Sequence, residues 1–225
     1  MNYPIKLTLK SEFIPAAILV LTVPLSIYFY LHFPERVAMH WNFAGQVDGW
    51  SSRGVGAFAI PGLIVGMYLL FLALPLLDPK KERYAEFDKI YHIFKGAILS
   101  MMFILYVLTS AYSLGFPVQI GEVVPLLVGG LFILLGNYMG KIKKNWFMGI
   151  RTPWTLSSEN VWNRTHRVGG HLFMLLGLII AISPLLPEWG AMVAIIGGMC
   201  VMVFGTLGYS YYLYSKEQRS KTVPK

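Results

Sequence analysis

Residues 55–77 read VGAFAIPGLIVGMYLLFLALPLL and contain no charged side chain. A bilayer core about 30 Å thick is crossed by roughly 20 apolar residues in helical conformation, so this stretch predicts a transmembrane helix. Five further apolar blocks lie along the chain, at about 13–31, 93–114, 123–138, 168–186 and 189–213. The sequence therefore predicts an all-α polytopic membrane protein, a bundle of about six transmembrane helices.

The composition excludes an ordinary soluble domain. Apolar residues make up 56% of the 225 residues, and charged residues make up 13%. The first block follows Lys6 and Lys10, which is also typical of a secretory signal peptide, but it is longer than the usual apolar region of about 7–15 residues and no small-residue cleavage site follows it. We therefore expect a retained first span. The single cysteine, Cys200, lies in the last block and is interpreted as a packing residue.

The distribution of Lys and Arg predicts the orientation in the membrane. If the N-terminus is cytoplasmic, 17 of the 19 Lys and Arg residues fall in inner segments, and only Arg36 and Arg53 fall outside. The positive-inside rule then places both termini in the cytoplasm. The net charge of +8 is accordingly interpreted as an insertion signal that also favours contact with lipid headgroups of the bilayer, and no direct binding of nucleic acid is expected.

Ionisable residues are scarce inside the predicted spans. Glu12, Lys95, Glu122 and Glu188 all fall at block ends, and His171 lies in the first turns of the fifth span. Charges within the membrane are typical of ion pathways and proton relays. The sequence therefore disfavours an ion channel or a proton-coupled pump.

The predicted outer loop, residues 32–54, reads HFPERVAMHWNFAGQVDGWSSRG. Pro34 should end the preceding helix, and Asn42, Gly45 and the pair Asp48-Gly49 are typical of turns, so we expect a compact, non-helical loop. The two other outer connections are short and apolar and are expected to offer little for binding.

Three interpretations of this outer loop remain open. The side chains of His32, His40 and Asp48 could converge on a cation such as Zn²⁺, although their spacing matches no recognised site. They could instead form a hydrogen-bonded scaffold. In the third interpretation, the loop contacts an extracellular ligand directly.

The densest group of specific residues is the segment 136–166, GNYMGKIKKNWFMGIRTPWTLSSENVWNRTH, in a predicted inner loop. Gly149 and Pro153 interrupt regular structure, and Ser157 or Ser158 is expected to cap a helix that carries Glu159 in its first turn. Anchoring in lipid explains the tryptophans and lysines, but it needs no fixed order of residues. The ordered series from Asn145 to Trp154 therefore indicates one conformation or one partner.

The inner-loop pattern resembles the signature of the SdpI family of bacterial membrane immunity proteins. The residues that carry this resemblance are Gly136-Asn137, Asn145, Gly149 to Leu156, Glu159, Trp162, Thr165-His166 and Gly169-Gly170. The outer loop is similar to a small N-terminal module of unknown function that is often fused to it, through Pro34, His40-Trp41-Asn42, Gly45 and Asp48-Gly49. We therefore expect a two-span module at 1–92 with outer loop 32–54, and a four-span SdpI-like module at 93–225 with cytoplasmic motif loop 139–167.

The resemblance implies a multi-pass protein of the bacterial plasma membrane that protects its host from a secreted, membrane-active antimicrobial peptide. A second implied role is to relay the presence of the toxin to a cytoplasmic transcriptional repressor of the winged-helix type. On this hypothesis the toxin contacts the outer loop at His40, Trp41, Asn42 and Asp48. The inner motif, which is structural or acts in relay, comprises Asn137, Asn145, Arg151, Thr152, Pro153, Trp154, Trp162 and His166.

Two competing functions are a transporter for a small solute or lipid and a membrane-embedded, metal-dependent enzyme. Ser157, Ser158, His166 and His171 are the crowded candidates for catalysis near the inner face, but no nucleophile motif such as GxSxG accompanies them. We therefore expect no enzyme activity and no cofactor.

Overall fold

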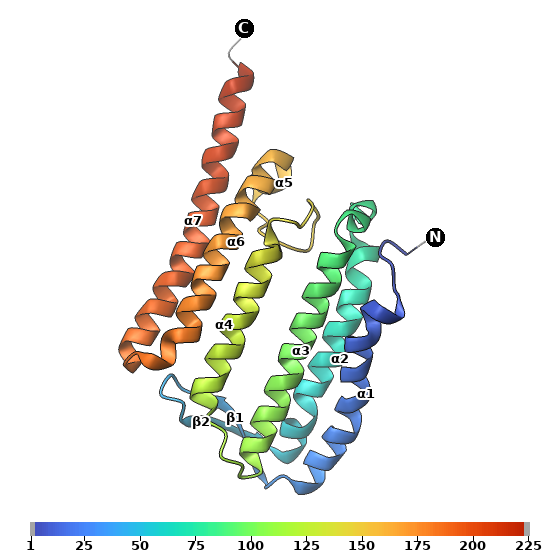
Figure 1. Cartoon of the computed structure of the whole chain (residues 1–225), viewed down its shortest axis with the longest axis vertical. Coiled ribbons are helices and arrows are strands. Elements are labelled where there is room, and N and C mark those ends of the chain that lie inside the picture. The colour runs from blue at the N-terminus through green and yellow to red at the C-terminus, as the bar shows by residue number, and fades with distance from the viewer. Residues whose placement is uncertain (1–2, 223–225) are drawn as a thin grey trace.

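The computed structural model describes residues 3–222 and contains six helices that are long and apolar enough to cross a membrane (Figure 1). They are α1 (Leu9–His32), α2 (Arg53–Leu77), α3 (Asp88–Ser113), α4 (Ile120–Met139), α6 (Glu159–Ile182) and α7 (Glu188–Thr222). The shorter elements are β1 (Arg36–Trp41), β2 (Val47–Ser52), α5 (Pro153–Ser157) and the 3₁₀ helices η1 (Lys81–Glu86) and η2 (Ser183–Leu185). The predicted bundle of six transmembrane helices is confirmed.

Local signals explain where the helices begin and end. Thr8 caps α1, because its hydroxyl accepts the backbone N–H of Ser11 at 3.1 Å. The same helix ends at His32, two residues before Pro34, as the restriction on residues that precede proline predicts. Of the two caps expected for α6, the structure uses Ser158, whose hydroxyl accepts the N–H of Val161.

The long helices form two groups of three (Figure 1). Helices α1, α2 and α3 pack against one another, while α4 packs closely on α6 and α6 packs on α7. The boundary between a module at 1–92 and a module at 93–225 stays a prediction. In the packing, α3, most of which follows that boundary, lies with α1 and α2.

Glycines bring α4 and α6 into backbone contact. A Cβ on Gly136 would lie 2.6 Å from the carbonyl oxygen of Gly170, and a Cβ on Gly129 would lie 2.4 Å from that of Gly177. Small residues allow this close approach in membrane bundles. Gly130, next in the chain, faces open space.

The outer loop folds as an antiparallel β-hairpin of β1 and β2. The sequence predicted a compact, non-helical loop but not its strands. The hairpin is anchored on the α1–α3 group, since Val37 is 2% exposed and the first turn of α2 places Gly56 against it. From there it extends across this end of the bundle towards α4 (Figure 1). We call this end the hairpin end, and the opposite end, which carries η1, α5 and both described ends of the chain, the loop end.

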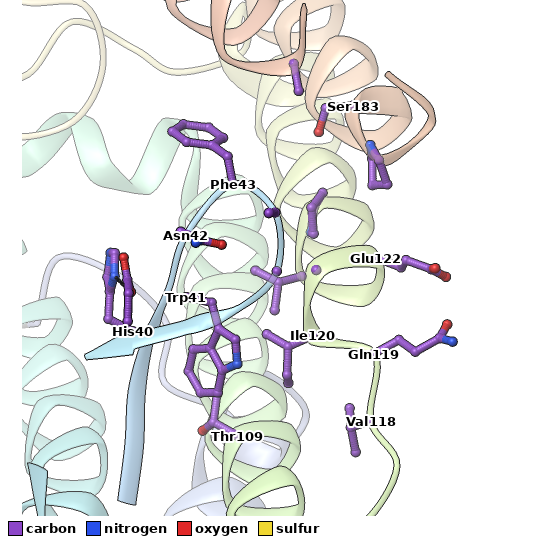
Figure 2. A pocket seen from close by; sticks show the side chains of 18 of the residues that line it. His40, Trp41, Asn42, Phe43, Thr109, Val118, Gln119, Ile120, Glu122 and Ser183 are labelled. Carbon is purple, nitrogen blue, oxygen red and sulfur yellow. Dashed lines mark hydrogen bonds and ion pairs between the residues drawn. The ribbon is translucent and has the colours of Figure 1, made fainter. Parts of the chain in front are cut away.

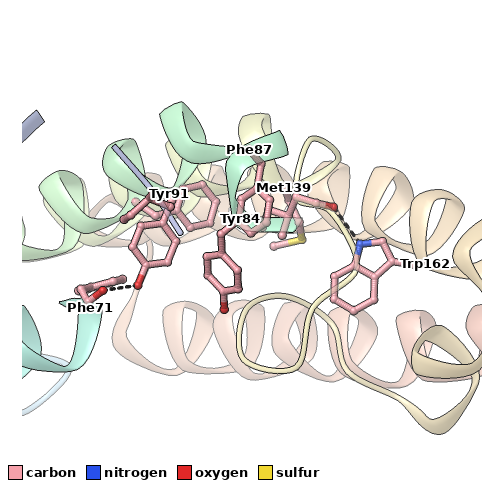
Figure 3. Close-up of a cluster of buried hydrophobic side chains, with 9 residues drawn as sticks. Phe71, Tyr84, Phe87, Tyr91, Met139 and Trp162 are labelled. Carbon is pink, nitrogen blue, oxygen red and sulfur yellow. Dashed lines mark hydrogen bonds between the residues drawn. The ribbon is translucent and has the colours of Figure 1, made fainter. Parts of the chain in front are cut away.

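An aromatic cluster joins the two groups at the loop end (Figure 3). Tyr84, Phe87 and Tyr91 from η1 and α3 pack near Met139 and Trp162 from the other group. Each aromatic side chain buries roughly 150–250 Å². The loop end is therefore held together by a continuous core.

Glu12 and Lys95, which the sequence places at block ends, lie near the loop-end starts of α1 and α3 and pair with each other. Lys95 is fully buried, and its ammonium lies 2.5 Å from the Glu12 carboxylate. The sequence places these residues 83 positions apart, so their pairing becomes visible only when α1 and α3 are packed.

Candidate functional site

A cavity of about 1100 Å³ lies at the hairpin end, lined by the hairpin and by helices of both groups (Figure 2). Its walls come from the hairpin, from α3, from the start of α4, and from the connection of α6 through η2 to α7. Apolar side chains such as Leu105, Val124 and Ile195 line it together with polar ones. Its volume is close to the upper end of the range of about 300–1,000 Å³ that is common for ligand pockets.

All four residues predicted to contact a ligand line this cavity, namely His40, Trp41, Asn42 and Asp48. The Nδ1 atom of His40 lies 2.5 Å from Oδ1 of Asp48. The two side chains are 72% and 45% exposed, so their pairing contributes at most about 1 kcal/mol to stability. They are therefore available to an incoming molecule.

Trp41 places an unused hydrogen-bond donor at the cavity. Its Nε1 is buried and has no partner among residues 3–222. The ring packs edge-on against Tyr112 of α3, with centroids 5.5 Å apart. Buried indole N–H groups usually find an acceptor, so this unpaired donor is an exception.

Asn42 shapes the tip of the hairpin. Its side-chain oxygen accepts the N–H of Gln46 at 2.9 Å. Gly45 follows with φ +73° and rests against Gly121 of α4, so closely that an added Cβ would lie 3.0 Å from the Gly121 Cα. The tip thus bridges from the α1–α3 group to α4.

The short outer connections contribute more than the sequence suggested. Gln119, Glu122, Ser183 and Glu188 line the cavity alongside the hairpin. These connections, expected to offer little for binding, thus form part of the cavity wall. No local signal could have identified them, because only the fold brings them to the hairpin.

The proposed convergence of His32, His40 and Asp48 on a metal is not seen in the described residues. They contain no group of three His, Cys, Asp or Glu residues that could hold a metal ion. The His32 ring instead lies at the end of α1, 2.7 Å from the carbonyl oxygen of Tyr28.

At the loop end, Asn145 organises the motif loop. Its side chain is fully buried, and its oxygen accepts the N–H groups of Phe147 and Met148 at 2.8 and 2.7 Å. Its amide donates to the carbonyls of Lys143 and Met148. All these hydrogen bonds join residues within the motif loop. This explains why its residues occur in a fixed order.

His166 fixes the next part of the motif loop. Its Nε2 accepts the N–H of Ile150 at 2.8 Å, and its Nδ1 lies 2.9 Å from the Trp162 carbonyl oxygen. A carbonyl only accepts, so the proton sits on Nδ1 and the ring is neutral. Gly149 has φ +107° and approaches the His166 ring so closely that a Cβ on Gly149 would lie 2.2 Å from Nε2 of His166.

The remaining motif residues tie the loop to α7 and to itself. Thr152 caps α5, with Pro153 in its first turn, and donates to Ser210 of α7 at 3.1 Å. Trp154 packs on Tyr211 of α7 at 5.1 Å between ring centroids. The guanidinium of Arg151 donates to the Trp146 carbonyl at 2.7 Å.

Two members of the motif differ in their surroundings. Trp162 is fully buried and donates from Nε1 to the Ile142 carbonyl at 2.8 Å (Figure 3). Asn137 is exposed on α4. The predicted motif residues therefore hold the loop to itself, to α6 and to α7, with Asn137 outside these contacts.

The sequence missed Asp78, which links the loop ends of the two groups. It is 2% exposed, and its carboxylate accepts the Trp146 N–H at 2.9 Å and the Tyr84 hydroxyl at 3.0 Å. Burial and the neighbouring Asp78 raise the pKa of Tyr84 above its ordinary value, so this phenol stays a donor. Arg83 adds an ion pair to Glu159 at 2.6 Å.

Comparisons with known proteins agree with the architecture. Residues 141–210, which cover the motif loop, α5, α6 and most of α7, match the SdpI/YfhL protein family, and residues 17–65 match a domain family of unknown function. The immunity protein SdpI of Bacillus subtilis (strain 168) is 29% identical over 214 residues, which are 95% of this chain and 100% of that protein. No solved structure matches the chain. The resemblance to the SdpI family that the motif loop indicated is thus confirmed, in a chain whose six apolar helices make it a multi-pass membrane protein.

Proposed function

We propose that this chain is a plasma-membrane immunity protein that protects a bacterium by binding a secreted, membrane-active peptide in the hairpin-end cavity. The observation that carries the proposal is the cavity of about 1100 Å³, lined by all four candidate residues of the outer loop. The similarity to an immunity protein over nearly the whole chain supports the same role.

The proposed orientation puts this cavity where a secreted peptide arrives. Among the Lys and Arg residues within 3–222, only Arg36 and Arg53 lie at the hairpin end. The positive-inside rule therefore favours an external hairpin end and a cytoplasmic loop end.

The lining of the cavity suits an amphipathic peptide. The apolar part of such a peptide would contact Leu105, Val124 and Ile195, and its polar groups would meet the exposed side chains of His40 and Asp48. Bound in this way, the peptide would no longer be free to disorder the bilayer. The role is binding, without a catalytic step.

As a second role, we propose that the chain relays the presence of the peptide to a cytoplasmic repressor. A signal would have to pass from the cavity to the motif loop at the other end of the bundle, and this requires two arrangements of the helices that bind the peptide with different affinity. The aromatic cluster and the Asp78 contacts join both groups at the loop end and could carry such a change.

The experiment is survival of a sensitive bacterium that expresses the chain and is challenged with a panel of secreted membrane-active peptides. Wild type should protect against at least one peptide, and Trp41→Ala or Asp48→Ala should abolish protection at unchanged membrane levels. Trp50→Ala is the matched control, because Trp50 lies on the same hairpin, is 51% exposed and does not line the cavity. Undiminished survival of the Trp41→Ala and Asp48→Ala cells would rule out the cavity as the site.

A further inference from the structure

A second cluster of polar groups lies near the loop end, inside the α1–α3 group and apart from the cavity. The Glu12 carboxylate of α1 accepts from the Lys95 ammonium of α3 at 2.5 Å and from the Tyr68 hydroxyl of α2 at 3.2 Å. His92 lies one helical turn before Lys95, and its Nδ1 is 3.7 Å from the same Glu12 oxygen that Lys95 contacts. Neither the peptide site nor the motif loop uses these residues.

The contacts of His92 define its tautomer. Its Nε2 lies 3.0 Å from the backbone carbonyl oxygen of Lys6. Since a carbonyl only accepts, Nε2 must carry a proton. In a neutral ring, Nδ1 is then a bare acceptor, and it is buried without a partner in the described part of the chain.

Two acceptors therefore face each other, the Nδ1 lone pair of His92 and the carboxylate of Glu12. Such an arrangement leaves a buried polar atom unsatisfied, which costs about 1–3 kcal/mol. A proton on Nδ1 would turn it into a donor directed at the carboxylate and would remove this cost.

We propose that His92 and Glu12 form a proton-binding site within the membrane bundle, in which His92 Nδ1 takes up one proton and directs it at the Glu12 carboxylate. The bond that forms is N–H on His92, and the proton comes from the aqueous phase at the loop end. No other group changes its bonding. The Lys95 ammonium remains on Glu12, so the cluster gains one positive charge.

Several groups around His92 set its proton affinity. The charged groups around it are the Glu12 carboxylate from α1 and, from its own helix α3, the Asp88 carboxylate and the Lys95 ammonium. The other titratable groups packed around the cluster are the hydroxyls of Tyr3, Tyr68 and Tyr91. Because His92 also holds the Lys6 carbonyl, the bound proton adds a link between α3, α1 and the segment before α1.

Nitrogen NMR of the histidine rings in purified protein in lipid nanodiscs tests this directly. His92 should show the Nε2–H tautomer near neutral pH, the reverse of the Nδ1–H tautomer that its contacts give His166. On acidification Nδ1 of His92 should gain a proton while Nε2 keeps its own. An Nδ1–H tautomer at neutral pH, or a ring that remains neutral down to the pH at which the protein unfolds, would overturn the proposal.

Glu12→Gln is the matched variant, because it keeps the shape of the side chain and removes only the charge. An opposite charge within about 4–6 Å shifts the pH of half-protonation of a group by about 1–3 units. The pH at which the His92 ring is half protonated should therefore fall by at least about one unit in this variant. An unchanged midpoint, in a variant whose His166 signals show the native fold, would exclude Glu12 as the proton's partner. Should Glu12→Gln not fold, His92→Gln is the second test. It can still donate to the Lys6 carbonyl but cannot titrate, so the change with pH in the protection factors of the amides at residues 6–12, after division by the intrinsic exchange rates, should disappear. Persistence of that change would contradict the proposal.

Discussion

Replacement of Gly149 by alanine tests how the motif loop is held. The residue has φ +107°, and an alanine Cβ would lie 2.2 Å from Nε2 of His166, the atom that accepts the Ile150 N–H. The unusual backbone conformation costs a side chain about 1–3 kcal/mol. Displacing the loop also leaves the buried His166 acceptor unpaired, at about 1–3 kcal/mol. Gly149→Ala should therefore lower the free energy of unfolding by about 2–6 kcal/mol.

Gly115→Ala is the matched control for this prediction. Gly115 has φ +89°, but nothing lies within 4 Å of the position that an added Cβ would occupy, so the substitution incurs only the backbone cost of about 1–3 kcal/mol. The assay is reversible unfolding of the purified variants in mixed micelles, followed by tryptophan fluorescence. If Gly149→Ala were no less stable than Gly115→Ala, the contact between the loop and His166 would contribute nothing, and the reasoning would be refuted.

Three further substitutions test other contacts. Gly136→Ala should destabilise the bundle by about 1–3 kcal/mol, because the added Cβ would meet a backbone carbonyl of α6. Gly130 faces open space, so Gly130→Ala should change stability by no more than about 0.5 kcal/mol in the same unfolding assay. Asp78→Ala should lower the free energy of unfolding by about 2–6 kcal/mol, because two donors lose their acceptor, and should change the fluorescence of Trp146; an unchanged unfolding midpoint would contradict this. The raised pKa of Tyr84 means that its contribution to stability is full below pH of about 10, the ordinary tyrosine value, and is lost as pH rises through the folded-state pKa. Tyr84→Phe should therefore lose less stability than wild type between pH 10 and the alkaline limit of the assay, and equal slopes would argue against a buried phenol.

The six spans were predictable from sequence because each depends on local composition. Runs such as residues 55–77 exclude charge over the thickness of a bilayer, and this alone predicts a helix. The caps at Thr8 and Ser158 are likewise local. For the motif loop, the fixed order of Asn145, Gly149 and Arg151 indicated one conformation before the contacts were visible.

What the sequence could not show depends on residues far apart in the chain. Lys95 looked like a residue at a block end, and only the packing of α1 on α3 reveals its buried pairing with Glu12. Nothing near Asp78 in the sequence singles it out, yet its carboxylate accepts a hydrogen bond from a residue 68 positions away. The hairpin-end cavity likewise needs Gln119 and Ser183 beside the hairpin, and no pattern near either residue indicates that.

The central claim, that the hairpin-end cavity faces outward and binds a secreted peptide, is tested most directly by labelling a cysteine in its wall. Thr109→Cys, in a background where Cys200 is serine, places one thiol in the cavity, and Glu35→Cys places one on the exposed surface at the same end. A membrane-impermeant maleimide added to intact cells should label both. The peptide against which the chain protects should slow labelling several-fold at position 109 and leave position 35 unchanged. Failure of the reagent to reach position 109 while it labels position 35, or equal labelling of position 109 with and without the peptide, would contradict the account.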